Sequence, residues 1–297
     1  GSTAMFEARR AVSHGDCDVA LVIGVDSLTQ FGGGTIPLVD DDWEISQGMT
    51  MPALYAMRAR RYMHEFGATV EQLAKVSVKA RSHGARNPDA QFQKSVTVEE
   101  VLGSRPIADP LTLLQCCPTG DGAAAAIICA SDVAGRFEAE PVKILASELC
   151  SGKFTNGFRD MTSMEIAVRG AGIAYEQAGL GPDDIDVAEV HDAFSIAELL
   201  YYEAFGFCER GEAVQLLESG ETTIGGQIVV NPSGGLLAKG HPIGGTGVAQ
   251  VVEIVRQLRG HCGDRQVEGA KVGLTHATGG GAMGMDSGAC SIHIFAR

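Results

Sequence analysis

Residues 231–250 read NPSGGLLAKGHPIGGTGVAQ, and this glycine-rich stretch decides how the rest of the chain is interpreted. Glycine lets the backbone adopt positive φ or approach a ligand closely, so the stretch predicts a backbone that forms one wall of a site. It contains a single histidine, His241, and from Thr246 onward apolar residues recur at helical spacing. A histidine in a rigid Gly/Pro loop just before a packed helix is favoured as a catalytic residue over a structural one.

Two nucleotide-binding motifs fit this stretch only in part. GGLLAKGHP spaces its glycines as a phosphate-binding loop does, but His241 and Pro242 stand where that motif needs Lys followed by Ser or Thr. GGTGVAQ begins like a dinucleotide fingerprint and then has Gln250 at the position of the third glycine. Neither motif is therefore accepted.

The composition is that of a globular protein without a nucleic-acid partner. The chain has 297 residues, of which 45% are hydrophobic and 20% are charged. Its formal net charge of −14 argues against binding nucleic acid, because phosphate binding needs a basic face. A local cluster such as Arg58, Arg60 and Arg61 could still bind a small anion. The same cluster is equally well interpreted as the solvent-exposed face of a helix.

The cysteines bear on the cellular compartment, and the lengths of the apolar runs bear on membrane insertion. Eight cysteines occur without a CxxC pair, which predicts reduced thiols in a cytoplasmic protein and no metal site. No apolar run approaches the ~18 residues that a transmembrane helix needs, so no membrane span is expected.

Alternating helical and apolar segments predict a layered α/β architecture with mixed sheets. Helices are expected at 3–14, 43–66, 70–83, 163–178, 195–205, 214–219 and from 246, and strands at 18–25, 121–130, 187–190, 227–230, 271–275 and 290–295. The apolar run at 18–25 is typical of a strand covered on both faces, 121–130 reads as a buried strand, and 290–295 alternates apolar and polar faces.

An internal repeat of one sequence pattern predicts two similar halves, 1–135 and 136–297. Gly1 opens a helix that leads to the strand at 18–25, as Gly245 opens a helix that leads to the strand at 271–275. Residues 29–114 are irregular between their helices and are expected to form an excursion that lies over the core.

At this point the chain resembles the thiolases, in the branch related to sterol-carrier-protein thiolases. The stretch 231–250 is similar to the family's histidine signature, and four further motifs follow the family's order. These are GMTMPALYAMRARRYM from Gly48, CCPTGDGAAAA from Cys116, HDAF at 191–194 and THATGGG from Thr275. The resemblance implies the thiolase fold, with duplicated layered α/β halves, mixed sheets, central helices and a loop-domain excursion.

The resemblance also implies chemistry on acyl-CoA thioesters, by Claisen condensation or thiolysis through an acyl-cysteine. His241 matches the histidine that takes the nucleophile's proton. His191 matches a position that places a water or donates to a thioester oxygen, and Asp192 could orient its ring or cap the helix at 195–205. The backbone N–H of Gly279 is expected in a second oxyanion hole. Coenzyme A or acyl-CoA is the expected substrate, with no permanently bound cofactor.

Two departures from the family pattern concern cysteines. The positions of the second catalytic cysteine hold Ala277 and Val272, so His276 is the nearest titratable replacement, with a structural role equally open. The nucleophilic cysteine of the family lies just before a segment like the one that starts at Gly1, so it is expected upstream of Gly1. None of the eight cysteines in the chain is a convincing substitute for this nucleophile, and Cys117 is favoured instead as a buried structural thiol.

Four residues are expected to lie along the acyl-CoA substrate, by resemblance. They are Met49, Cys117, Ser233 and Gly240. A homodimer or higher oligomer is expected, since thiolases pair through sheet edges, and a small acyl-CoA-binding partner subunit is plausible.

Two rival functions stay open. Loss of the second cysteine favours a non-catalytic subunit that binds acyl-CoA or scaffolds a partner, whereas the presence of both HDAF and GHP opposes it. An aldolase or decarboxylating enzyme on the same fold would work without that cysteine.

Overall fold

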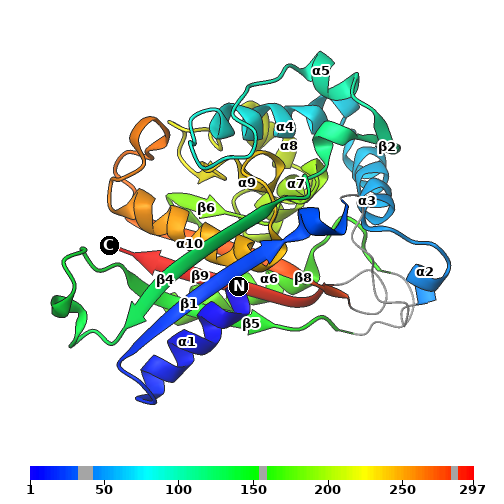
Figure 1. The fold of residues 1–297 in the computed structure, drawn as a ribbon. Coiled ribbons are helices and arrows are strands. Elements are labelled where there is room, and N and C mark those ends of the chain that lie inside the picture. Colours follow the sequence, from blue (N-terminus) through cyan, green and yellow to red (C-terminus); the bar gives the residue numbers. More distant parts are fainter. Residues whose placement is uncertain (33–42, 154–158, 282–286) are drawn as a thin grey trace.

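The computed structural model describes residues 1–32, 43–153, 159–281 and 287–297. Two β-sheets enclose a layer that contains α1 (Ser2–His14) and α10 (Ile243–Leu258) (Figure 1). Helix α10 contacts β1 and β4 of the smaller sheet and β8 of the larger one, and α1 likewise contacts both sheets. The layered α/β architecture with central helices is therefore confirmed.

The smaller sheet has two antiparallel strands, β1 (Val19–Ser27) and β4 (Asp121–Cys129). The larger sheet has the strand order β5-β9-β8-β6-β7. Its strands are β5 (Lys143–Cys150), β6 (Val187–Glu189), β7 (Val229–Val230), β8 (Val272–Gly281) and β9 (Ser287–Ala296). Strand β9 is antiparallel to both β5 and β8, while β6 is parallel to β7 and β8, so this sheet is mixed, as predicted.

The two halves repeat one arrangement, as the internal repeat predicted. Helix α1 leads into β1, which pairs antiparallel with β4, and α10 leads into β8, which pairs antiparallel with β9. The first turns of the two helices touch. A Cβ on Gly247 would lie 2.5 Å from the Cβ of Ser2, and one on Gly1 would lie 2.5 Å from the carbonyl oxygen of Gly244. Only glycine permits so close an approach.

The remaining elements gather mainly on one side of the two sheets (Figure 1). The α-helices are α2 (Trp43–Ser46), α3 (Met51–Phe66), α4 (Val70–Gly84), α5 (Val98–Leu102), α6 (Glu165–Ala178), α7 (Ser195–Ala204), α8 (Ala213–Glu218) and α9 (Gly235–Ala238). Short strands are β2 (Pro106–Ala108) and β3 (Leu111–Thr112), and 3₁₀ turns are η1 (Leu28–Phe31), η2 (Leu113–Gln115), η3 (Ala134–Arg136), η4 (Pro182–Asp184) and η5 (Gly263–Arg265). No helix within the described ranges is long and apolar enough to cross a membrane.

The excursion at 29–114 packs on helices of the second half. Helix α3 contacts α7, and α4 contacts α7, α8 and α9. The boundaries of the halves, 1–135 and 136–297, stay a prediction.

Within the single chain, the strand at 18–25 is covered on one face only, whereas coverage of both faces was predicted. Leu21 is 63% exposed, whereas Val22 is 2% exposed. The strand at 121–130 is likewise buried on one face, with Ile127 59% exposed. Exposure alternates because α1 and α10 cover only the inner face of the β1–β4 sheet.

One other local prediction needs correction. The single helix predicted over 43–66 is interrupted between α2 and α3, where Gly48 has a φ of 94° that a helix does not allow. Strand β9 has the predicted alternation, with Ile292 and Ile294 on one face and Ser291 and His293 on the other, and every residue from Cys290 to Phe295 is buried. Its His293 is held between two hydroxyls, with Nε2 3.0 Å from Oγ of Ser2 and Nδ1 2.9 Å from Oγ of Ser147.

Candidate active site

His241 lies in the short segment between α9 and α10. Gly240, just before it, has a φ of 105°, a conformation that glycine adopts readily, and Pro242, just after it, caps α10. The backbone of His241 also forms a bridge with Thr119, which precedes β4. The side chain is half-buried. The ring is therefore held in place by the backbone on both sides and still has an accessible part.

A hydroxyl sets the tautomer of His241. Its Nδ1 is 2.8 Å from Oγ1 of Thr246, and that hydroxyl donates to the carbonyl oxygen of Pro242 at 2.9 Å. A hydroxyl has one proton, so it accepts from Nδ1–H and leaves Nε2 unprotonated. Burial, with a smaller effect of the Lys239 charge, lowers the pKa of His241 to about 4. His241 is thus neutral at pH 7, with Nε2 able to accept a proton.

His191 follows β6 and meets His241 edge to face. The two ring centroids are 4.9 Å apart, with 85° between the ring planes. Burial, followed by the proximity of His241 and of Lys239, lowers the pKa of His191 well below its usual value. Its buried Nδ1 has no hydrogen-bond partner among the residues that the structure describes. Two neutral imidazoles, distant in sequence, therefore converge at one place.

Two buried carboxyl groups hold the glycine-rich loop. Glu189 accepts the backbone N–H of Ser233 at 3.0 Å and its hydroxyl at 2.7 Å. Asp192 accepts the N–H of Leu236 at 2.7 Å, and a Cβ on Gly235 would lie 2.2 Å from its other oxygen. The predicted capping of α7 by Asp192 is wrong, because no side chain caps that helix. Asp192 instead fixes the loop that precedes His241.

Several glycines of the loop serve packing within the protein. A Cβ on Gly240 would lie 2.7 Å from Oε1 of Gln91. Pro242 packs as closely against β4. A Cβ on Gly122 of β4 would lie 2.8 Å from Cγ of Pro242. The stretch was predicted to form one wall of a site, and much of its backbone is instead pressed against β4 and the excursion.

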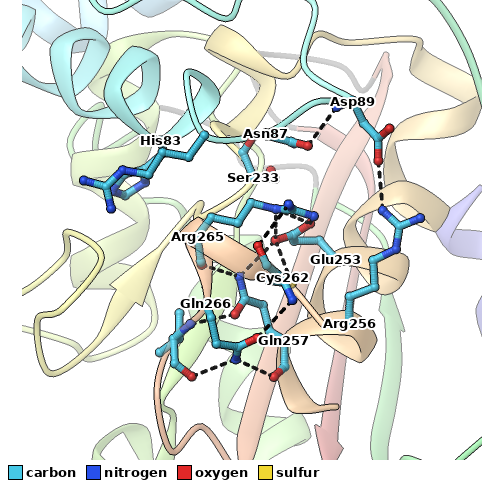
Figure 2. A network of polar contacts seen from close by, with 12 residues as sticks. His83, Asn87, Asp89, Ser233, Glu253, Arg256, Gln257, Cys262, Arg265 and Gln266 are labelled. Carbon is cyan, nitrogen blue, oxygen red and sulfur yellow. Dashed lines mark hydrogen bonds and ion pairs between the residues drawn. The ribbon is translucent and has the colours of Figure 1, made fainter. Parts of the chain in front are cut away.

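A polar network ties this loop to the far end of α10 (Figure 2). Asn87 donates to the carbonyl oxygen of Ser233 at 2.9 Å, and the neighbouring Asp89 pairs with Arg256 of α10 at 2.9 Å. One turn earlier on α10, Glu253 forms a buried ion pair with Arg265 at 3.0 Å. These contacts connect the last turns of α10 to the excursion and to η5.

The comparisons with known proteins agree with this layout. Residues 1–132 match the thiolase N-terminal domain, and residues 148–290 match the thiolase C-terminal domain-like family.

The chain belongs to the thiolase family.

Relatives of this thiolase chain include an acetyl-CoA acetyltransferase and sterol carrier protein 2. An acetyl-CoA acetyltransferase of Methanothermobacter thermautotrophicus is 46% identical over 100% of this chain and 77% of that protein. Sterol carrier protein 2 of Oryctolagus cuniculus is 40% identical over 95% of this chain, which spans only 55% of that protein. Among solved structures, the Ltp2-ChsH2(DUF35) aldolase has a TM-score of 0.86 and 30% identity, over 100% of this chain and 77% of that one.

His276, expected as an acid/base or a structural residue, lies behind His191 in this thiolase chain. It is fully buried in β8, with its ring centroid 4.3 Å from that of Tyr201 and 5.1 Å from that of Phe205. Its Nδ1 accepts the backbone N–H of His191 at 3.4 Å. The geometry therefore favours the structural alternative.

The other predicted site residues are placed as follows. Gly279 lies in β8 opposite Ala289, and Met49 is half-buried just before α3. Ser233 is fully buried on Glu189, as described above. Cys117 donates its N–H to the carbonyl oxygen of Ala193, two residues after His191, at 2.8 Å, and burial raises the pKa of the Cys117 thiol to about 12. Such a thiol is a poor nucleophile at pH 7. The oxyanion and acyl-CoA contacts of these residues stay predictions.

The arginine cluster on α3 is engaged within the protein. Arg58 is buried and donates to the carbonyl oxygen of Met161 at 2.8 Å. Arg60 pairs with Asp109, and Arg61 pairs with Glu65 on the next turn. The anion-binding reading of this cluster therefore has no support in the geometry.

Sequence reasoning missed a buried ion pair beneath the site. Lys79 of α4 lies 2.8 Å from Glu198 of α7, with side chains 4% and 0% exposed. Glu198 also accepts from Nδ2 of Asn231 at 2.8 Å, and Oδ1 of Asn231 accepts the N–H of Val190 at 2.8 Å. Asn231 has a φ of 55°, unusual for a residue other than glycine. In the sequence, the residue that could have indicated this buried polar group is Asn231, at the start of the histidine signature.

We expect acid to destabilise the fold between pH ~6.5 and ~4. Burial lowers the pKa of His83 to about 3, and of His241 and His293 to about 4. The unfolded chain takes up protons first as pH falls, so each such histidine costs up to about 1.4 kcal/mol per pH unit in that window. Burial raises the pKa of Glu189 to about 7 and also raises the pKa of Asp192 and of Glu203, so these carboxyl groups oppose the trend. Urea unfolding from pH 7.5 to 4.5 should show the fall, and a constant free energy of unfolding would contradict it.

Proposed function

We propose that this thiolase chain transfers acyl groups on coenzyme A thioesters, by Claisen condensation or by thiolysis of a 3-oxoacyl-CoA. The observation that carries the proposal is the contact of two neutral imidazoles, with ring centroids 4.9 Å apart. His241, with Nε2 unprotonated, takes a proton, while His191 donates to a thioester carbonyl oxygen or to a water. Acyl-CoA is the substrate, and no permanently bound cofactor is needed.

The nucleophile in this proposal is a cysteine just before Gly1. The start of α1 supports that position, because Gly1 lies against Gly244, shortly after His241. His241 takes the thiol proton, and the thiolate attacks the thioester carbonyl. In condensation, the proton then passes to the departing sulfur, which gives an acyl-cysteine and free coenzyme A. In thiolysis, the thiolate instead attacks the 3-oxo carbonyl, the bond between C2 and C3 breaks, and the proton passes to the departing acetyl-CoA carbanion. The N–H of Gly279 is proposed to bind an oxyanion, and the positive end of α1 favours the thiolate.

The test uses the natural, full-length protein. It is incubated with acetoacetyl-CoA, or with a longer 3-oxoacyl-CoA, in the presence and absence of coenzyme A. We expect cleavage of the bond between C2 and C3 that depends on coenzyme A and yields two thioesters, acetyl-CoA and a shortened acyl-CoA. Intact-mass spectrometry should show an acyl adduct on a cysteine. Binding of acyl-CoA without turnover or adduct would overturn the proposal and favour a non-catalytic binding subunit.

A second candidate function is carbon–carbon cleavage by a retro-aldol reaction. It is favoured by the TM-score of 0.86 to the Ltp2-ChsH2(DUF35) aldolase, and by Ala277 at the position of the second cysteine. Retro-aldol cleavage of a 3-hydroxyacyl-CoA needs no added coenzyme A and leaves no acyl adduct. The same two measurements, made with a 3-hydroxyacyl-CoA, separate the two functions.

We also propose association with a second copy and with a small acyl-CoA-binding subunit. The exposed apolar face of the β1–β4 sheet supports the first, since Leu21 and Val25 are each 63% exposed. The aldolase named above is a complex with a DUF35 component, which supports the second.

His191→Asn should retain more activity than His191→Ala. An amide can still donate to a water or a thioester oxygen, whereas a methyl group cannot. Both variants should keep the melting temperature of the wild type within a few degrees, since the ring is only half-buried. The comparison is made on kcat with a 3-oxoacyl-CoA. Equal losses in the two variants would show that the His191 side chain donates no hydrogen bond to the reaction.

A further inference from the structure

Helix α10 holds both histidines of the site through two residues one turn apart. Thr246 accepts from Nδ1 of His241 at 2.8 Å. Gln250 donates from Nε2 to the carbonyl oxygen of His276 at 3.0 Å. Residues at i and i+4 lie on the same face of a helix, so one face of α10 supports both connections.

The second connection continues from His276 to His191. Nδ1 of His276 accepts the backbone N–H of His191 at 3.4 Å, so Nδ1 is unprotonated and the neutral ring carries its proton on Nε2. The aromatic rings of Tyr201 and Phe205, with centroids 4.3 and 5.1 Å from that of His276, prevent the ring from turning away. A hydrogen bond between the two residues therefore ties the HDAF segment to strand β8.

His276 and Gln250 are both 0% exposed, which argues against direct contact with a substrate. They are also costly to bury. Nε2 of His276 and Oε1 of Gln250 have no hydrogen-bond partner among the residues that the structure describes. A buried polar atom without a partner costs about 1–3 kcal/mol, so an apolar pair would suit the core better. The pair is therefore better explained by the backbone groups that it holds than by stability.

We propose that Gln250 and His276 are positioning residues that hold His191 against His241, so that α10 sets the spacing of the two rings. This inference rests on the proposed function for its catalytic consequence, although the connection itself can be tested without turnover. His276 acts through its Nδ1 as an acceptor and transfers no proton in the reaction.

Three variants test the connection. In His276→Asn, the side-chain oxygen can replace Nδ1 as the acceptor, whereas His276→Leu removes the acceptor. Gln250→Met removes the donor at nearly constant volume and provides a second variant if His276→Leu folds poorly. The matched control is Thr275→Val, since Thr275 neighbours His276 in β8, is 1% exposed and has an Oγ1 without a partner among the described residues.

The first measurement is NMR of the protein labelled with ¹⁵N-histidine and at the backbone. We expect the wild type to carry the His276 proton on Nε2. The His191 amide resonance should shift in His276→Leu and Gln250→Met, and return toward its wild-type position in His276→Asn. A proton on Nδ1 of His276, or an unmoved His191 amide in His276→Leu, would overturn the inference. This measurement stands even if the protein proves not to transfer acyl groups.

The second measurement is kinetic and uses the natural, full-length protein. A misplaced catalytic group costs up to about 100-fold, so kcat should fall about 10-fold to 100-fold in His276→Leu. KM and the melting temperature should change little, Thr275→Val should match the wild type, and His276→Asn should recover most of the loss. An equal loss in His276→Asn would mean that His276 transfers a proton, which contradicts a positioning role.

Discussion

His241→Ala should lower kcat for acyl transfer by about 10²–10⁴-fold, the contribution that a positioned general base makes. The stability should change little. The ring is half-buried, and its side-chain hydrogen bond is to Thr246, whose hydroxyl still donates to the carbonyl oxygen of Pro242. The measurement is kcat on a 3-oxoacyl-CoA in the natural, full-length protein, with the melting temperature determined in parallel.

Two further variants serve as comparisons for His241→Ala. His261→Ala removes an exposed histidine just beyond α10 and should leave kcat unchanged. Thr246→Val keeps the imidazole and removes the acceptor for Nδ1, so it should lower kcat by less than His241→Ala does. A His241→Ala protein that keeps full activity, or one that unfolds, would contradict the assignment of His241 as the base.

The fold could be predicted because its main signals are local in sequence. The glycine-rich loop and the helix after it lie within residues 231–258, and the apolar strands are continuous runs. The repeated pattern of a glycine, a helix and a strand reappears as α1 and α10 side by side, with a strand following each. The resemblance then supplied what local patterns could not, namely that His191 and His241 belong to one site.

What could not be predicted depends on pairings between distant segments. Which face of the strand at 18–25 is covered depends on the positions of α1 and α10. Whether the arginines of α3 are available for an anion depends on partners such as Met161 and Asp109. The role of His276 depends on the backbone of His191, in the segment that follows β6. Sequence spacing contains none of this information.

The buried carboxyl groups show the same limit. Glu189 and Asp192 lie on either side of His191 in the sequence, and Asp192 was expected to orient the His191 ring or to cap the helix at 195–205. The structure directs both toward backbone N–H groups of the glycine-rich loop, at 3.0 and 2.7 Å. Burial raises the pKa of both. The acidic residues thus serve the loop geometry, and the histidines are left as the groups suited to proton transfer.

The largest effect on stability should come from Lys79→Met. Lys79 and Glu198 are 4% and 0% exposed, with 2.8 Å between Nζ and the carboxylate oxygen. Removing one partner of a buried ion pair leaves the other charge uncompensated, which costs about 3–5 kcal/mol. Lys79 also donates to the carbonyl oxygen of Val230 at 2.9 Å, just before the histidine signature, so this bond is lost as well. Urea unfolding should show the loss as a lower midpoint at an unchanged m-value.

Two comparisons identify the cause of that loss. Lys75→Met on the same helix breaks the pair with Glu218, whose side chains are 45% and 34% exposed, and it should cost less than about 1 kcal/mol. The double variant Lys79→Met/Glu198→Gln removes both charges, while the new amide can still bond the hydroxyl of Tyr202, which contacts Glu198 in the wild type. It should therefore recover most of the stability that Lys79→Met loses. If the double variant is as unstable as Lys79→Met, the loss comes from packing and from the bond to Val230, and the buried charge is not its cause.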